Sequence, residues 1–376
     1  MKDNIYNSYM EVDLKILKAN FERVRAHIGP DIDIIPILKG NAYGLGGIEL
    51  AKFYVDEFDV KMIGNAQVWE SVEMREAGIN CELLVLGGVP FNNIPAAVKY
   101  SIQTTAFEQE YVDLLDEEAA RQGKVAEIQI KINTGMNRIG VKPGEDLLSF
   151  VKYLKTKDNI KVRGAFTHYA SSHAKEHSFA TQQFELFKQE IEEIKAEGME
   201  LDYIHTCNGC ATVWFPEAYC TAVRPGNLLL GYDYNKNPLD SLGIEHAVTW
   251  RCFVTQIKML QPGDTLGYDQ YFTATEPTKV ATISMGHGDG YYRPMLMEGG
   301  HALINGKKCK FLGTSMDQSY LAIDGVPDVV LNNEVTLLGK DGDYEITPFD
   351  WRDFTGQSFV FLNSIRNVRV KRIYLK

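Results

Sequence analysis

The chain has 376 residues, of which 45% are hydrophobic, so it is long enough to bury a large core and to form two domains. Its formal net charge of −11 leaves no global basic field, which argues against a protein that binds nucleic acid or anionic membrane surfaces. The opening residues lack the basic region and apolar run of a signal peptide, and no stretch approaches the ~20 apolar residues of a membrane span. We therefore expect a cytoplasmic protein without nucleic-acid or membrane partners.

From residue 12 to about residue 235, short β-rich runs alternate with amphipathic helical patterns. The runs that we expect to form strands are residues 32–38, 61–65, 82–86, 101–106, 127–132, 162–167, 203–206 and 222–230. Between them lie helical stretches such as 179–197, where Phe184, Phe187 and Ile191 recur at spacings of three and four. This alternation is typical of βα units, and eight such units predict a (β/α)8 TIM-like barrel.

Beyond about residue 240, turn residues come often and the apolar runs are short, as in WRCFVTQIKML, KVATISMG and VTLLGK. This pattern predicts a separate, mostly antiparallel β domain. We therefore expect an α/β chain with a barrel over residues 11–238 and a C-terminal β domain over residues 239–376, with which residues 1–10 could pack. A single continuous α/β sheet with a β appendage is the alternative.

The six cysteines are few for this length, so the sequence predicts no disulfide framework. Cys207 and Cys210 form a lone CxxC, with Cys220 further on. A zinc site normally needs a second pair of ligands, and no second CxxC follows nearby. We therefore expect buried structural thiols and no metal site.

Polar residues fall where predicted barrel strands end, which is where barrel active sites are built. They are Lys39, Arg138, His168, Asn208 and Arg224. Each alone has an ordinary explanation as a solvated or hydrogen-bonded side chain, but their joint placement favours one shared site. A lysine at the end of an apolar strand is desolvated enough for its pKa to fall, as a lysine that binds a carbonyl cofactor covalently requires.

Several motifs, in order along nearly the whole chain, resemble those of alanine racemases. They are IIPILKGNAYGLG, KINTGMNRIG, GAFTHYA, HTCNGCA, AVRPGNLLLGY, LGYDQY, MGHGDGYYRP and SMDQS. The resemblance implies a barrel that binds pyridoxal 5'-phosphate, followed by a β domain, in a homodimer whose active sites are shared between subunits. It also implies a racemase that interconverts L- and D-alanine for cell-wall synthesis.

Position by position, the resemblance implies catalytic roles. Lys39 would carry the cofactor and move the α-proton on one face of the amino acid, and Tyr268 of the partner subunit would move it on the other. His168 would polarise Tyr268, and Arg224 would contact both His168 and the pyridine nitrogen of the cofactor. A permanent cation there keeps that nitrogen unprotonated and weakens the ring as an electron sink.

The resemblance also assigns binding roles. Arg138 would contact the phenolic oxygen of the cofactor and the substrate carboxylate, and Lys131 matches a lysine that is often carbamylated to hold Arg138. An ordinary strand lysine is the alternative there. The backbone at Met316 would face the substrate carboxylate, Asp317 would lie near the second base, and Arg293 would line the entrance. The predicted cofactor-binding set is Lys39, Tyr43, Arg138, His168, Asn208, Gly209, Arg224, Gly226 and Asn227, and the predicted substrate-binding set is Arg138, Tyr268, Met316 and Asp317.

The chain departs from the family pattern at several positions. Gly209 replaces a serine that donates to the phosphate, and Val360 or Phe361 stands where a C-terminal tyrosine is expected. At the entrance and the substrate pocket, His287 replaces a tyrosine and Ser315 replaces a cysteine. These changes leave serine, lysine or ornithine open as alternative substrates.

Two other functions remain as alternatives. A barrel-type amino-acid decarboxylase also uses a barrel lysine, but such enzymes place a carboxylate against the pyridine nitrogen, where this chain has Arg224. A non-catalytic pyridoxal-phosphate-binding paralogue is disfavoured, because single-domain carriers lack the β domain that would carry Tyr268.

Overall fold

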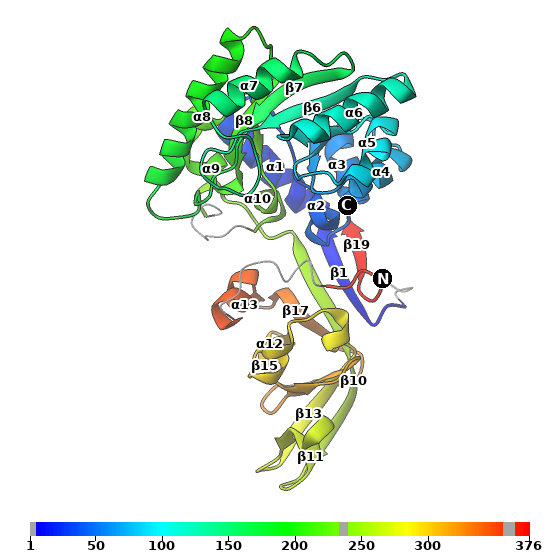
Figure 1. The fold of residues 1–376 in the computed structure, drawn as a ribbon. Coiled ribbons are helices and arrows are strands. Elements are labelled where there is room, and N and C mark those ends of the chain that lie inside the picture. The colour runs from blue at the N-terminus through cyan, green and yellow to red at the C-terminus, as the bar shows by residue number, and fades with distance from the viewer. Residues whose placement is uncertain (1–4, 233–239, 356–364) are drawn as a thin grey trace. The chain divides into compact units, whose positions relative to one another are not determined.

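The computed structural model describes residues 5–232, 240–355 and 365–376. The chain divides into two compact units (Figure 1). The barrel unit is built mainly from Asn20–Leu229, and the β unit mainly from Met1–Ala19 and Glu245–Lys376.

The barrel unit is a closed parallel sheet. In the described part of the chain its strands are β2 (Asp33–Ile34), β3 (Met62–Asn65), β4 (Glu82–Val85), β5 (Gln103–Ala106), β6 (Ala126–Lys131), β7 (Ile160–Phe166), β8 (Tyr203–Asn208) and β9 (Ala222–Arg224). They are ordered β2-β9-β8-β7-β6-β5-β4-β3. A parallel bridge between Ile37, just beyond β2, and Gly64 of β3 joins the two ends of this order. The predicted (β/α)8 barrel is therefore confirmed.

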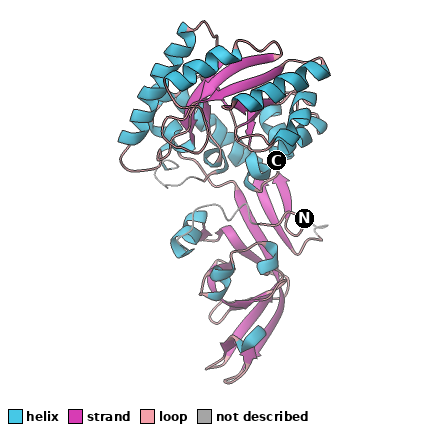
Figure 2. Ribbon diagram, viewed as in Figure 1, coloured by secondary structure: helices cyan, strands magenta, loops and turns pink. Residues whose placement is uncertain are grey.

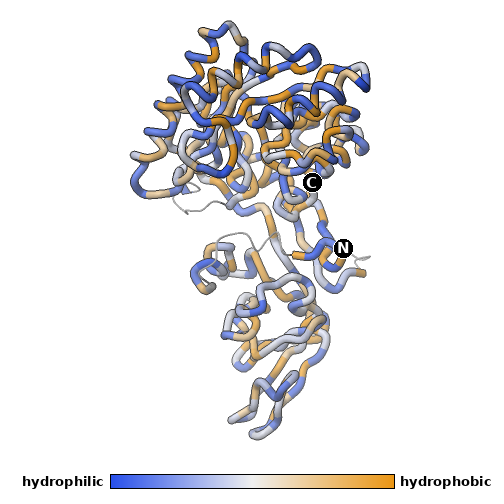
Figure 3. The backbone as a smooth tube through the Cα atoms, viewed as in Figure 1, coloured by the Kyte–Doolittle hydropathy of each residue, from blue (hydrophilic) through white to orange (hydrophobic). Residues whose placement is uncertain are grey.

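Helices alternate with these strands (Figure 2). They are α1 (Leu14–Ile28), α2 (Lys39–Tyr43), α3 (Gly47–Phe58), α4 (Val68–Glu76), η1 (Phe91–Asn93), α5 (Ile94–Lys99), α6 (Gln109–Gln122), α7 (Glu145–Leu154), α8 (Ser178–Ala196), α9 (Gly209–Trp214), η2 (Pro216–Ala218) and α10 (Asn227–Leu230). Hydrophobic and hydrophilic residues alternate along them (Figure 3), as expected of helices with one buried face. In α8, Phe187, Ile191 and Ile194 join a core cluster with residues of β6 and β7. None of the described helices is both long and apolar enough to cross a membrane.

The β unit is a second, mostly antiparallel sheet. Among the described residues its strands are β1 (Ser8–Asp13), β10 (Val248–Leu260), β13 (Thr278–Ile283), β14 (His301–Ile304), β15 (Lys307–Thr314), β16 (Ser319–Ala322), β17 (Glu334–Asp341), β18 (Tyr344–Ile346) and β19 (Lys371–Leu375). They are ordered β18-β17-β14-β15-β16-β13-β10-β1-β19, with a further pairing of β17 and β10. The shorter elements are β11 (Thr265–Leu266), η3 (Tyr268–Gln270), β12 (Phe272–Thr273), η4 (His287–Asp289), α12 (Arg293–Met297) and α13 (Pro348–Thr355). Trp250, Tyr291 and Trp351 form an aromatic core. A β domain separate from the barrel was predicted, and the alternative of one continuous sheet is wrong.

Several predicted elements differ from the structure. The run 32–38 is a strand only over Asp33–Ile34, followed by an isolated bridge at Ile37. The run 222–230 is a strand only as far as Arg224, because Pro225 lacks the amide hydrogen that a central strand needs, and α10 follows. The strand β1 pairs antiparallel with β10 and parallel with β19. Residues 11–13 therefore belong to the β sheet, although the prediction gave them to the barrel. The predicted division between residues 238 and 239 lies outside the described residues.

The predicted CxxC cysteines carry free thiols. Cys207 and Cys210 are buried, and Cys220 is partly buried. Burial raises the pKa of Cys207 to about 12, so the thiol is protonated at neutral pH and is a poor nucleophile.

Candidate active site

Lys39 begins a left-handed backbone turn at the carboxyl edge of the barrel. Gly40, Asn41 and Ala42 have φ/ψ of 63/41°, 56/50° and 52/52°, and Tyr43 has a φ of 55°. Each non-glycine residue in this left-handed region costs roughly 1–2 kcal/mol, so such turns persist only where other contacts hold them. The Lys39 Nζ lies 5.9 Å from the centre of the Tyr43 ring. The turn thus brings the predicted cofactor lysine and the predicted phosphate ligand together.

The Lys39 ammonium lies in cationic surroundings. Its pKa is lowered first by burial and then by the positive charges of Arg138 and Arg224, while the carboxylate of Glu70 opposes them. Lys39 is nevertheless solvent-exposed in the single chain, so water screens part of these interactions. A lowered pKa enlarges the neutral fraction of the amine, and only the neutral amine attacks a carbonyl or accepts a proton.

Arg224, at the end of β9, is 4% exposed and contacts several polar groups inside the barrel. Its guanidinium donates to the carbonyl oxygens of Thr167 at 2.8 Å and Thr206 at 3.0 Å. It also meets Nδ1 of His205 at 2.7 Å and Nδ1 of His168 at 3.3 Å. A guanidinium only donates hydrogen bonds, so both Nδ1 atoms act as acceptors and the imidazole protons lie on Nε2.

Both imidazoles are held neutral. Burial, and then the positive charge of Arg224, lowers the pKa of His168 and that of His205 well below the usual value of 6.5. A neutral His168 with its proton on Nε2 can donate one hydrogen bond toward the site, as a polarising residue must. The predicted contact between Arg224 and His168 is thus present in the structure.

A chain of buried polar side chains continues from Arg224 through the barrel. Nε2 of His205 lies 2.6 Å from Oε1 of Gln129, and Nε2 of Gln129 donates to Oε1 of Gln103 at 3.0 Å. Gln103 in turn donates to a carboxylate oxygen of Glu82 at 2.7 Å. We call Arg224, His205, Gln129 and Gln103 the polar column. Its inner members were not predicted, although polar residues inside otherwise apolar strands were a visible signal.

Lys131, at the end of β6, is 3% exposed. Its Nζ donates to the carbonyl of Ile132 at 3.0 Å and lies 3.5 Å from the hydroxyl of Thr167. Burial, and then the charges of Arg224 and Arg138, lowers the pKa of Lys131 to about 7. A large neutral fraction is what reaction with carbon dioxide requires, but carbamylation stays a prediction. Arg138 is itself exposed and lies close enough to influence Lys39, Lys131 and His168.

Two of the predicted phosphate ligands, Tyr43 and Gly226, lie against each other in the barrel unit. A Cβ added to Gly226 would overlap the hydroxyl oxygen of Tyr43 and lie 3.1 Å from its Cζ, so the phenol reaches the backbone of Gly226 only because this residue is glycine. Asn227 begins α10, and Gly209 begins α9. A phenol hydroxyl beside backbone amides is a donor set that suits a phosphate, so these residues fit the cofactor.

Of the other predicted phosphate-region positions, Asn208 caps a helix, and the C-terminal pair is not described. The side-chain oxygen of Asn208 accepts from the amide of Ala211 at 3.1 Å and from the hydroxyl of Ser172 at 2.9 Å, so it caps α9. Val360 and Phe361, which stand in place of a tyrosine, lie outside the described residues.

The remaining predicted residues belong to the β unit. Tyr268, in η3, is 77% exposed, and Met316 is 52% exposed. Arg293 begins α12 and is exposed. Asp317 follows Met316 and also lies at the surface.

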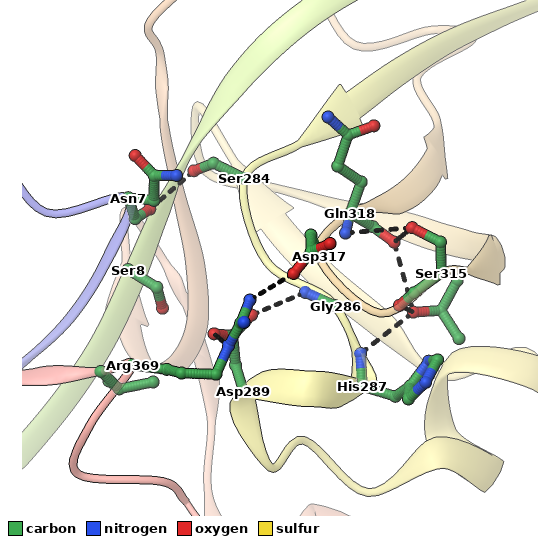
Figure 4. Close-up of polar contacts among 12 residues, drawn as sticks. Asn7, Ser8, Ser284, Gly286, His287, Asp289, Ser315, Asp317, Gln318 and Arg369 are labelled. Atoms are coloured by element: carbon green, nitrogen blue, oxygen red, sulfur yellow. Dashed lines mark hydrogen bonds and ion pairs between the residues drawn. The ribbon is translucent and has the colours of Figure 1, made fainter.

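Asp317 is tied to two other segments of the β unit (Figure 4). The guanidinium of Arg369 donates to Asp317 at 2.6 Å and to Asp289 at 2.8 Å. The amide of Gly288 donates to the carbonyl of Met316 at 2.8 Å. Arg369 therefore braces the segment that carries Met316. Sequence reasoning missed it, because nothing in its local sequence marks it.

His287 and Ser315, which were predicted to lie at the entrance and the substrate pocket, contact each other in this region. The amide of His287 donates to the carbonyl of Ser315 at 3.1 Å (Figure 4). The hydroxyl of Ser315 accepts from the amide of Gln318 at 3.2 Å. Ser315 thus contributes to the turn that carries Met316.

Known proteins match the chain over both units. Family models for the alanine racemase N-terminal and C-terminal domains match residues 12–234 and 247–374. The alanine racemase of Carboxydothermus hydrogenoformans is 33% identical over 370 residues, which make up 98% of this chain and 99% of that protein.

Solved structures of amino-acid racemases are also similar to this chain. The alanine racemase of Clostridium difficile 630 is similar with a TM-score of 0.93 and 27% identity, covering 99% of this chain and 97% of that one. The histidine racemase of Leuconostoc mesenteroides subsp. sake NBRC 102480 is similar with a TM-score of 0.88 and 25% identity, covering 99% of each chain. Because the family models span both units, the chain belongs to the alanine racemase family and is an amino-acid racemase.

Proposed function

We propose that this racemase interconverts L- and D-alanine, with pyridoxal 5'-phosphate as cofactor and with Lys39 and Tyr268 as the two proton-transferring residues. The observation that carries the proposal is the buried Arg224 and its contact with neutral His168, in the same unit as a lysine of lowered pKa. A fixed cation there is unsuited to a decarboxylase, which needs a protonated pyridine nitrogen.

When bound, pyridoxal 5'-phosphate supplies an electron sink that acidifies the α-hydrogen of an amino acid. The residues of this chain would bind and orient it: Tyr43 and the amide of Gly226 at the phosphate, and Arg224 at the pyridine nitrogen. Arg224 cannot give up its proton easily, so it keeps that nitrogen unprotonated and limits the electron sink. A weak sink disfavours side reactions and leaves return of the proton as the main outcome.

Lys39 and Tyr268 would move the proton. The neutral amine of Lys39 takes or returns it on one face. Tyr268 would act on the opposite face, with Nε2 of His168 donating a hydrogen bond to the phenol oxygen and stabilising the phenolate. The hydrogen bonds of Arg224 fix the His168 ring in the tautomer that can donate.

The proposed second base would come from a second copy of the chain. Tyr268 is a large ring with 77% of its surface exposed, as expected of a residue that a partner covers. A sharp test mixes two inactive variants, Lys39→Ala and Tyr268→Phe, and refolds them together. A mixed dimer would contain one site with both residues intact, so random pairing should restore up to about a quarter of wild-type activity. No recovery, with mixed dimers shown by mass spectrometry, would refute sharing.

The similar proteins differ in the amino acid that they racemise. Most of the similar proteins are alanine racemases, but the similar Leuconostoc protein is a histidine racemase. Together with His287 and Ser315 at the entrance and the substrate pocket, this makes another amino acid the second candidate.

The primary experiment combines spectroscopy with chiral analysis. The purified protein should show a cofactor absorbance band that borohydride alters, with the reduced cofactor mapped to Lys39 by peptide mass spectrometry. L-alanine, L-serine, L-lysine, L-ornithine and L-histidine are then supplied in parallel. D-alanine as the dominant product supports the proposal, another D-product shifts the substrate, and a cofactor band without any D-product contradicts racemase activity.

A further inference from the structure

We propose that Glu70 is a positioning residue for Lys39, whose carboxylate holds the left-handed turn that follows the lysine. Glu70 lies in α4 and is 6% exposed. This inference rests on the proposed function of Lys39 but concerns a residue outside the predicted site.

The hydrogen bonds of Glu70 join two segments. Its Oε1 accepts from the amides of Gly40 and, at 3.3 Å, Asn41. Its Oε2 accepts from the amides of Ala66 at 3.1 Å and Gln67 at 3.0 Å. One carboxylate thus connects the backbone after Lys39 to the start of α4.

These contacts provide hydrogen-bond acceptors for the first two amides of the turn. The amides of Gly40 and Asn41 open the turn, where the following amide, that of Ala42, already bonds to the carbonyl of Leu38 at 2.6 Å. Neither amide has a backbone acceptor within the turn, and a charged acceptor forms stronger hydrogen bonds than a neutral one. Without Glu70, the strained backbone would relax toward right-handed conformations and turn Lys39 and Tyr43 apart.

Glu70 also acts on Lys39 through its charge. Its carboxylate raises the pKa of Lys39, against burial and the two arginines. Removing the negative charge should therefore lower the Lys39 pKa further. The effect of the Glu70 charge can be separated from that of its hydrogen bonds, because an aspartate at this position keeps the charge but is shorter.

The test compares Glu70→Gln and Glu70→Asp with the matched control Glu73→Gln, an exposed residue of the same helix. Glu70→Gln replaces one acceptor oxygen by a donor, so we expect the Kd for pyridoxal 5'-phosphate to rise roughly tenfold or more. Glu70→Asp should also weaken binding. The control should bind as the wild type does, and equal Kd values for all four proteins would overturn the proposal.

Two further readouts do not depend on the activity of the loaded enzyme. In the cofactor-free protein, the pH midpoint for Lys39 modification by an amine reagent should fall in Glu70→Gln and stay near wild type in Glu70→Asp. In the cofactor-free wild type, hydrogen exchange should show protected amides at Gly40 and Asn41. Rapid exchange there would overturn the proposal even if a variant fails to fold. If the wild type binds no pyridoxal 5'-phosphate, the proposed function fails, while these readouts still decide the role of Glu70.

Discussion

Replacing Gln129 with Leu tests the polar column. The change removes the acceptor of His205 Nε2 and the donor to Oε1 of Gln103, and leaves both groups buried. A stranded buried polar group costs about 1–3 kcal/mol, so the two together predict a loss of about 2–6 kcal/mol in barrel stability. The comparison is Gln182→Leu, the same chemical change at an exposed position in α8.

Native-state hydrogen exchange of peptides from β5 to β8 measures this loss in the barrel unit itself, which matters because a chain of two units need not unfold in one step. A double-mutant cycle with His205→Phe isolates the contact: Gln129→Leu should cost about 1–3 kcal/mol less where the His205 N–H is already gone. If Gln129→Leu and Gln182→Leu differ by less than about 0.5 kcal/mol, the column does not stabilise the barrel as argued.

Three further predictions concern the proposed chemistry and its pH range. Tyr268→Phe should keep the cofactor bound and abolish α-deuterium exchange on one stereochemical face only, so equal loss on both faces would contradict two bases. Arg224→Lys should slow racemisation but keep the ratio of transamination to racemisation low, whereas Arg224→Glu should raise it; a flat ratio in both would refute the role assigned to the charge. Because His168 and His205 have lowered pKa values, they stay neutral when folded and gain protons on unfolding below pH 6.5. The barrel stability that these two neutral imidazoles contribute should thus be complete above pH 6.5 and fall by up to about 2.7 kcal/mol per pH unit below it, and a hydrogen-exchange profile that is flat below pH 6.5 would contradict their burial as neutral groups.

Local patterns in the sequence predicted most of the fold, because burial imposes a short period on each strand and helix. The stretch 179–197 is α8 within a residue at each end. Residues 1–10 were expected to pack with the β domain, but the extension of β1 to Asp13 was not predictable in this way. Its partners in β10 and β19 lie more than two hundred residues further along the chain, and the pairing of distant segments leaves no local pattern.

The residues of the candidate site also differ in whether the local sequence could predict them. Lys39, His168 and Arg224 were visible because a charged or polar residue directly after an apolar strand is unusual. Glu70 was not, since it acts through contacts with another element. A glutamate near the start of a helix is ordinary until the backbone that it binds is known.

The placement of β1 between β10 and β19 has a consequence for how the chain is made. The ribosome releases β1 long before the strands on either side of it, and one of them, β19, is among the last parts synthesised. At roughly 5–20 residues per second, β1 waits for β19 for about 20–70 s. The barrel strands are completed within that time, while β1, whose residues are mostly buried in the finished sheet, keeps an unpaired edge of the kind that chaperones bind and that promotes aggregation.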